Sequence, residues 1–388
     1  MSDTVIVATA RTPIGRAYKG SLKDVRPDDM GGFIVSECLK KVPQLDPSQI
    51  DDVMIGAANH VGEQSLNLGR NIAALAGLPD TVPGTTVNRF CASSLQTIRM
   101  AFHAIEAHEG EVFVAGGVES TSRTLGVGFS EKDLNPRFTD HSRSDFINEM
   151  FIPMGLTAEN VAKKFGVSRL RMDEFAKISQ DRAVEAQNNG TFDREITPFP
   201  RGDGTIVAKD DGPRPNTNLE TLSQLPPSFA ENGLITAGNS CPLNDGAAAV
   251  LVMSTRKAKE LGLTPLARII ASSVSGLAPE IMGVGPVEAV KKVLALAKMS
   301  LSDIGTVELN EAFAAQVLAV CDQLGISIED QLNPHGGAIA LGHPFGMTGA
   351  RIMTTLINDL QMRDQQFGLE TMCVGGGMGM AMIIERLS

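Results

Sequence analysis

The chain has 388 residues, of which 45 are acidic and 34 are basic, so its formal net charge is −11. At about 150 residues per domain, this length predicts two to three domains. The negative charge disfavours nucleic acid and anionic membranes as partners, because both repel an acidic surface. Hydrophobic residues make up 43% of the chain and charged residues 20%, which is typical of a folded globular protein and excludes a disordered one.

The first 120 residues alternate between strand and helix patterns. Strands are predicted at 4–10, 51–58 and 85–90, and helices at 28–40 and 91–110. In the second helix one face carries the apolar residues Leu95, Ile98, Phe102 and Ile105. The next strand begins at 111 and is predicted to end in a turn at Gly116 and Gly117. Strands interleaved with helices predict an α/β fold.

The composition changes near residue 120. Residues 120–235 are rich in polar residues, Pro and Asn and have few apolar strand patterns. The run AAAVLVM at 247–253 then predicts a strand that is covered on both faces. Residues 120–240 are therefore predicted to form an insertion that leaves and re-enters one domain.

The last third repeats the pattern of the first. IGTVELNEAF (304–313) resembles the strand and polar turn at 51–60, and both are followed by a turn and a helix. The spacing from Gly56 to Cys91 is 35 positions, and the spacing from Asn310 to His343 is 33. This similarity predicts that one α/β unit has been duplicated.

The five cysteines are widely spaced, at Cys38, Cys91, Cys241, Cys321 and Cys373. No C-x-x-C pair occurs, which disfavours zinc-ribbon and thioredoxin-like sites. An odd number of distant cysteines is typical of free thiols in a reducing compartment. The N-terminal apolar run is short and is interrupted by Arg11, so we expect neither a signal peptide nor a membrane span. The sequence therefore predicts a cytoplasmic protein.

Cys91 and His343 both lie in segments that lead into a predicted helix. A helix N-terminus favours the thiolate form of a cysteine, which is the nucleophilic form; alternatively, Cys91 is a small buried apolar residue. His343 precedes Pro344, a residue suited to a first helical turn. Its neutral imidazole could take a proton from a thiol or donate to an oxyanion, or it could serve only in packing.

Cys373 and Asn310 follow or end predicted strands in the second repeat. The glycines after Cys373 leave room for a ligand beside the thiol, and an Asn at a strand end can hold a water molecule or is a plain turn residue. Open α/β sheets bind ligands at the ends of their strands, so we expect these residues to meet Cys91 and His343. The glycine turns complete no G-x-G-x-x-G motif, and the histidines show no H-E-x-x-H spacing, so neither a dinucleotide site nor a metal site is expected.

Several longer motifs resemble those of the thiolase family over essentially the whole chain. In order they are VIVATARTPIGRAYKGSL, VNRFCASSLQ, VAGGVESTSR, MGLTAENVA, AGNSCPLNDGAAAV, ELNEAFAAQ, GGAIALGHPFGMTGAR and CVGGGMGMAM. The resemblance implies duplicated α/β core domains in a five-layer α/β/α/β/α arrangement with an inserted loop domain. It places the N-terminal core domain at 1–119 plus 241–265, the loop domain that binds coenzyme A at 120–240, and the C-terminal core domain at 266–388.

The resemblance also implies a role for each matching residue. Cys91 would be acylated, and His343 would be the base that activates it. Cys373 would move the proton at the acetyl α-carbon. Asn310 would hold a water in one oxyanion hole with His343, and the backbone N–H groups of Cys91 and Gly375 would form the other. Coenzyme A and a 3-ketoacyl-CoA would be the substrates, with no metal and no prosthetic group.

Contacts with coenzyme A are likewise implied. Arg214 and Thr221 would lie near the nucleotide, while Met154 and Met282 would line the pantetheine tunnel. Cys241 stands where family members often carry Ser.

The subtype implied is the degradative one, a 3-ketoacyl-CoA thiolase of fatty-acid β-oxidation that forms a homodimer or homotetramer. VNRFCASSLQ resembles the degradative members, and Pro153 stands where short-chain biosynthetic members have His. An acetoacetyl-CoA thiolase that condenses two acetyl-CoA molecules is the alternative. Two rivals share the fold: a decarboxylating ketoacyl synthase, which carries histidine where Cys373 stands, and a non-catalytic carrier of acyl-CoA.

Overall fold

One mixed sheet of ten strands runs through the computed structural model, which describes residues 3–127, 130–140, 142 and 146–388. In chain order its strands are β1 (Thr4–Arg11), β2 (Gly15–Arg16), β3 (Asp52–Gly56), β4 (Gly84–Val87), β5 (Val112–Ser120), β8 (Asn244–Ser254), β9 (Ala267–Gly276), β10 (Thr306–Leu309), β11 (Phe367–Val374) and β12 (Met378–Arg386). Across the sheet the order is β10-β11-β12-β9-β1-β8-β5-β3-β4, and β2 pairs with β8. β6 (Phe199–Pro200) and β7 (Ile206–Val207) pair separately.

The two halves of the sheet repeat one topology. β3 is parallel to β5, β5 antiparallel to β8, and β8 antiparallel to β1. In the second half β10, β11, β12 and β9 follow in the same relations. The halves join where β1 meets β9 through two residue pairs, Val5 with Arg268 and Ile6 with Ala267. The predicted duplication is confirmed.

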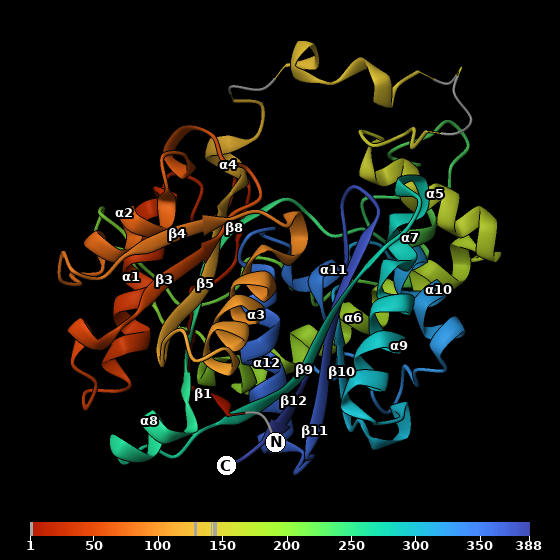
Figure 1. The fold of residues 1–388 in the computed structure, drawn as a ribbon. Coiled ribbons are helices and arrows are strands. Elements are labelled where there is room, and N and C mark those ends of the chain that lie inside the picture. Colours follow the sequence, from red (N-terminus) through yellow and green to blue (C-terminus); the bar gives the residue numbers. More distant parts are fainter. Residues whose placement is uncertain (1–2, 128–129, 141, 143–145) are drawn as a thin grey trace.

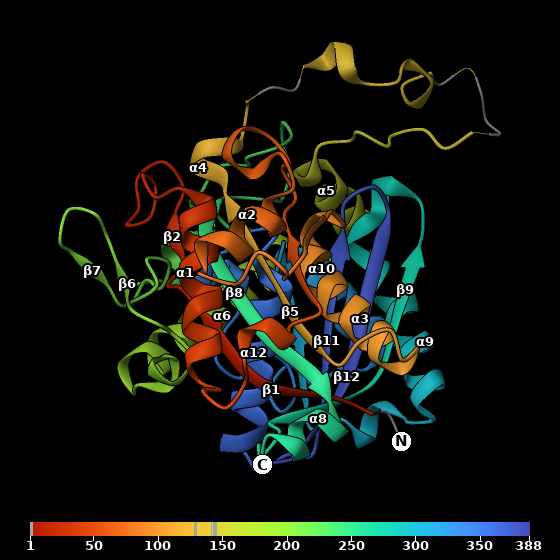
Figure 2. The same ribbon diagram turned by 60° about the vertical axis from the view of Figure 1, so that its left-hand side comes forward.

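Helices divide the molecule into five layers (Figure 1). α3 (Ser93–Glu106) and α12 (Thr348–Met362) pack against each other between the two half-sheets. α1 (Pro27–Lys40) and α2 (Leu68–Leu75) cover the outer face of the first half, with α1 lying against β5 and β8 (Figure 2). α9 (Gly285–Ala297) and α10 (Ala314–Leu324) cover the outer side of the second half.

The core follows the apolar periodicity of these helices. Leu95, Ile98 and Ile105 of α3 are at most 2% exposed and pack in a central cluster with apolar residues of α12 and of both half-sheets. Burying three such side chains contributes roughly 1.5–3 kcal/mol each. Since the cluster draws on both halves, it holds them together.

The insertion contributes helices to the second half of the molecule. α5 (Met154–Phe165) and α6 (Arg169–Asn188) contact α10 and share its apolar cluster. The remaining short helices are α4 (Thr121–Thr124), α7 (Leu219–Ser223), α8 (Thr255–Glu260) and α11 (Ala338–Leu341). β8 re-enters the first half-sheet between β1 and β5. Residues 128–129, 141 and 143–145 of the predicted 120–240 loop domain lie outside the described residues, and the domain boundaries stay a prediction.

One local prediction was wrong. Gly116 and Gly117 were expected to form a turn, but both lie inside the continuous strand β5. A Cβ atom at Gly117 would lie 1.9 Å from the carbonyl oxygen of Gly346. Glycine is therefore needed here because its missing side chain lets a neighbouring loop approach closely, and not because the chain turns.

Candidate active site

The segments that carry Cys91 and His343 meet at the adjoining starts of α3 and α12. Cys91 lies in a single 3₁₀ turn, η3 (Phe90–Ala92), directly before α3, and His343 lies between α11 and α12. The backbone N–H of Ala350 donates to Ser94 Oγ at 2.9 Å. Pairing of the two central helices therefore places the segments at one pole of the sheet.

The Cys91 thiol lies against the glycine turn that follows β11. It is partly exposed, and the backbone N–H groups of Gly375 and of Cys91 itself hydrogen-bond its sulfur. Burial nevertheless raises the pKa of the Cys91 thiol to about 11. The backbone N–H groups lower the pKa, in the direction expected of a helix start, but burial outweighs them and favours the thiol form at neutral pH.

Three thiols, those of Cys91, Cys241 and Cys373, lie close enough together to interact electrostatically. Cys373 is fully buried in β11 opposite Gly379. Burial raises its pKa well above the ordinary value, and the nearby sulfurs of Cys91 and Cys241 raise it further. Burial, with Cys91 close by, also raises the pKa of Cys241. At neutral pH all three are thiols, so Cys373 holds a proton that it can donate.

The His343 ring is held from several sides. Its Nε2 lies 3.2 Å from Asn310 Nδ2, and its Nδ1 lies 2.6 Å from Thr348 Oγ1. Its backbone N–H donates to Asn244 Oδ1 at 3.0 Å. Burial lowers the pKa of His343 to about 3, and the positive charge of Arg351 adds to this effect. The ring is therefore neutral at pH 7 and able to accept a proton.

Glu119 connects the loop that contains His343 to the first half of the molecule through hydrogen bonds. Its fully buried carboxylate accepts the backbone N–H groups of Ala58 (2.8 Å), Asn59 (3.2 Å) and Gly346 (2.9 Å), and the side chain of Gln64 (2.7 Å). Gly346 is three residues after His343. The contact thus complements the close approach of Gly346 to Gly117.

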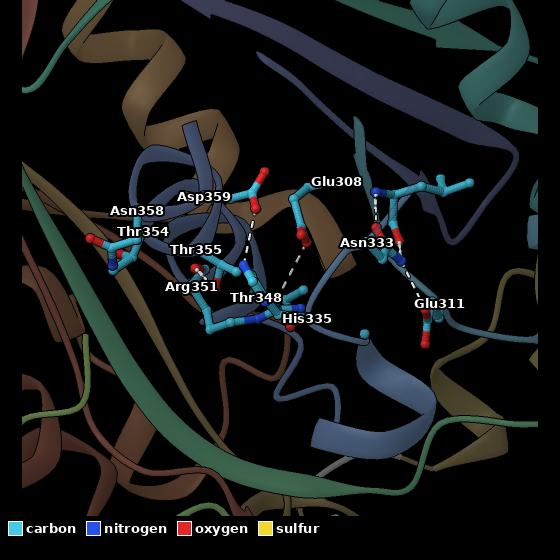
Figure 3. A network of polar contacts seen from close by, with 12 residues as sticks. Glu308, Glu311, Asn333, His335, Thr348, Arg351, Thr354, Thr355, Asn358 and Asp359 are labelled. Atoms are coloured by element: carbon cyan, nitrogen blue, oxygen red, sulfur yellow. Dashed lines mark hydrogen bonds and ion pairs between the residues drawn. The ribbon is translucent and has the colours of Figure 1, made fainter. Parts of the chain in front are cut away.

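A group of buried ionisable side chains includes Arg351 and Glu308, which are drawn with their neighbours in Figure 3. Arg351 of α12 lies 3.9 Å from a carboxylate oxygen of Glu308 in β10, and both side chains are 1% exposed. Burial raises the pKa of Glu308 well above its ordinary value, and that of Glu370 in β11 likewise. Arg351 opposes both shifts while it disfavours a charged His343. Of this group, Arg351 acts on the ring, and its effect adds to the larger effect of burial.

The residues expected near coenzyme A lie in different parts of the structure. Met154, the first residue of α5, borders the glycine turn: a Cβ at Gly375 would lie 3.8 Å from its sulfur. Met282 is 2% exposed within the core of the second half. Arg214 lines a cavity of about 30 Å³ with Gln180 and Ser240 among others.

Thr221 and Cys241 complete the expected set. The Thr221 backbone N–H donates to Asn218 Oδ1 at 2.9 Å, and its hydroxyl donates to the Asn218 carbonyl at 3.0 Å, as part of the N-cap of α7. The Cys241 backbone donates to Ala312 at 3.0 Å. Their contacts with coenzyme A stay predictions.

Sequence reasoning missed three supporting residues, namely Thr348, Asn244 and Glu119. Asn244 and Glu119 stand in motifs that were quoted, N-D-G and V-E-S-T-S-R, but their partners in the His343 loop are more than 90 positions away along the chain. Thr348 lies five residues after His343, where a helix start could have suggested a contact.

Known proteins that resemble this chain over its whole length are acyltransferases and thiolases. The chain resembles acyltransferases throughout its length: a solved acetyl-CoA acetyltransferase from Bacillus anthracis superposes with a TM-score of 0.91 at 39% identity, covering 100% of this chain and 99% of that one. The thiolase N-terminal domain family matches residues 4–256, and the thiolase C-terminal domain family matches residues 263–386. The chain belongs to the thiolase family and is an acyltransferase enzyme.

Relatives that match over their full length include 3-ketoacyl-CoA thiolases and beta-ketoadipyl-CoA thiolases. A 3-ketoacyl-CoA thiolase of Bacillus subtilis is 45% identical over 99% of this chain and 100% of that protein. A beta-ketoadipyl-CoA thiolase of Acinetobacter baylyi is 44% identical over the whole of both chains. The dimeric peroxisomal thiolase of Saccharomyces cerevisiae superposes with a TM-score of 0.92 at 38% identity, covering 99% and 97% of the two chains.

Neither a metal cluster nor a membrane helix is found in the part of the chain that the structure describes. No three His, Cys, Asp or Glu side chains there are grouped so that they could hold a metal ion. No helix among those residues has both the length and the apolar character needed to cross a membrane. The five cysteines are free thiols.

Proposed function

We propose that the protein is a 3-ketoacyl-CoA thiolase that cleaves its substrate with coenzyme A through an acyl group on Cys91. The observation that carries the proposal is that the Cys91 thiol lies against Gly375 with the protonated Cys373 thiol close by. Neutral His343 lies in the segment before α12, whose start packs beside the start of α3. A neutral thiol beside a neutral imidazole suits proton transfer at the moment of attack. Relatives named 3-ketoacyl-CoA thiolase support the substrate class.

The first half-reaction transfers the acyl group to the enzyme. His343 takes the Cys91 proton as the sulfur attacks the ketone carbon, and the resulting oxyanion is stabilised by prearranged donors at Asn310, Gly375 or Cys91. The bond between C2 and C3 then breaks, and the acetyl-CoA carbanion takes the proton of Cys373. Passage of the proton from His343 to the Cys373 thiolate restores both groups.

The second half-reaction regenerates Cys91. The thiol of free coenzyme A attacks the acyl-Cys91 thioester, and its proton passes to the departing sulfur of Cys91. One thioester replaces another, so the transfer is reversible at little energetic expense, which favours cysteine over serine. Coenzyme A acts as a substrate throughout, and no prosthetic group takes part.

Apolar side chains around the glycine turn favour the binding of acyl chains longer than acetoacetyl. Cβ atoms at Gly375 and Gly376 would lie 3.5–3.9 Å from Phe90, Met150 and Met154. Each methylene that such a wall buries contributes roughly 0.8 kcal/mol, or about fourfold in binding. We infer that substrates of six or more carbons are preferred, in a degradative, cytoplasmic enzyme of fatty-acid β-oxidation that forms a homodimer or homotetramer.

Two variants test the division of roles. After mixing with a 3-ketoacyl-CoA, mass spectrometry should find the acyl group on Cys91 in the wild type and no adduct in Cys91→Ala. Cys373→Ala should stop solvent deuterium from entering the methyl group of acetyl-CoA, while Cys91 can still be acylated. An adduct on another residue would contradict the first assignment, and exchange at the wild-type rate would contradict the second.

A substrate series tests the subtype. Thiolysis of 3-ketoacyl-CoAs of four to twelve carbons, with 3-ketoadipyl-CoA included, should give a higher kcat/KM at six or more carbons than for acetoacetyl-CoA. A maximum at four carbons would indicate the biosynthetic acetoacetyl-CoA thiolase. A maximum for 3-ketoadipyl-CoA would place the protein with the relatives that bear that name.

A further inference from the structure

The Thr348 hydroxyl is in contact with two groups at once. Its oxygen lies 2.6 Å from His343 Nδ1 and 2.8 Å from the carbonyl oxygen of Pro344, one helical turn back. Thr348 is 0% exposed and His343 is 1% exposed, so water does not compete for either contact. The two short distances together restrict where the hydrogens can be.

A hydroxyl has a single hydrogen, and only one arrangement satisfies both contacts. If that hydrogen pointed at Nδ1, two oxygen atoms would face each other at 2.8 Å with no hydrogen between them, which is repulsive. The hydrogen therefore lies on the Pro344 carbonyl, and the Thr348 oxygen accepts a hydrogen from Nδ1. In a neutral ring Nε2 then carries a lone pair, which agrees with the Asn310 amide nitrogen 3.2 Å away acting as a donor.

We propose that Thr348 is a positioning residue that holds His343 in the tautomer with hydrogen on Nδ1, so that Nε2 is the atom that accepts a proton. This inference rests on the proposed function, in which His343 is the base for Cys91. The hydroxyl orients the ring as the Asp does in a Ser-His-Asp triad, but without a negative charge. The nearby charge is instead the positive Arg351, which agrees with a ring that stays neutral in the free enzyme.

Three variants separate positioning from packing. Thr348→Val keeps the shape and removes the hydroxyl, Thr348→Ser keeps the hydroxyl, and Thr354→Val is the matched control. Thr354 is a buried residue six positions further along α12. Its hydroxyl donates to the carbonyl oxygen of Ala350, four residues back, at 2.9 Å and makes no hydrogen bond to a histidine in the described part of the chain. Loss of the hydrogen bond that sets the tautomer should lower kcat of Thr348→Val about tenfold, with KM for coenzyme A within twofold, while Thr348→Ser and Thr354→Val stay near wild type.

Nuclear magnetic resonance of ¹⁵N-histidine reads the tautomer directly. The chain has six histidines, and His343→Asn identifies the resonances of His343. The wild type should show hydrogen on Nδ1 and a lone pair on Nε2, and Thr348→Val should show a mixture of tautomers. Hydrogen on Nε2 in the wild type would overturn the proposal, as would equal kcat values for Thr348→Val and Thr354→Val.

The spectrum also distinguishes this proposal from the proposed function. The wild-type spectrum needs neither turnover nor a folded Thr348→Val protein, so it decides the tautomer even if that variant does not fold. Full activity of His343→Ala would refute His343 as the base, yet it would leave the tautomer result standing. A wild-type lone pair on Nδ1 would refute the positioning role alone.

Discussion

Acidification should destabilise the protein through His343. Its pKa is lowered from 6.5 to about 3 in the folded protein, chiefly by burial. Between these two values the unfolded chain binds a proton that the folded chain does not. The stability that comes from a neutral His343 is therefore present above pH 6.5 and is lost as pH falls towards 3.

The magnitude follows from linkage. At about 1.36 kcal/mol per pH unit, the gap between 6.5 and about 3 corresponds to roughly 5 kcal/mol in total. Between pH 7 and pH 5, where the fold is easier to study, the loss from this group alone is about 2 kcal/mol. His343→Asn removes the titrating group and leaves every other one in place.

Urea unfolding of both proteins at pH 7, 6 and 5, at one protein concentration, measures the effect. The free energy of unfolding of the wild type should fall by about 2 kcal/mol more than that of His343→Asn between pH 7 and pH 5. His343→Gln should behave as His343→Asn does. Parallel pH dependence of wild type and variants would refute a neutral, desolvated His343.

Three further substitutions test other parts of the structure. Glu119→Gln turns an amide group towards two of the four donors that the carboxylate accepts, so it should destabilise the protein by about 2–6 kcal/mol and lower kcat; an unchanged melting temperature would contradict this. Arg11→Met leaves Asp210 and Glu195 buried without their partner, which should lower the free energy of unfolding by about 3–5 kcal/mol in urea titration. Phe90→Gly relieves a positive φ of 45° but removes an apolar side chain beside the glycine turn. The ratio of kcat/KM for long substrates to kcat/KM for acetoacetyl-CoA should therefore fall. An unchanged ratio would show that Phe90 does not contact the acyl chain.

The sequence predicted the alternation of strands and helices and the duplication because both depend on local periodicity. Ile98 and Ile105 fall on one helical face whether or not the partner helix is known. The family motifs also indicated Cys91, His343 and Cys373 as a set. The protonation of these groups was not predictable, because the desolvation that raises the pKa of Cys91 comes from segments hundreds of positions away. The turn expected at Gly116 failed for a similar reason, since the neighbour that requires a glycine is a distant loop.

The narrow junction between β1 and β9 bears on how the enzyme tolerates change. Cys91 belongs to the first half, whereas His343 and Cys373 belong to the second, and the main-chain ladder joins the halves through only two residue pairs. Alignment of the proposed nucleophile and base therefore depends on contacts outside the sheet ladder, namely the packing of α3 on α12 and the hydrogen bonds of Glu119 and Asn244 to the His343 loop. Substitutions of apolar residues between α3 and α12 should displace the two segments by tenths of an ångström. They should therefore impair turnover well before they unfold either half of the molecule.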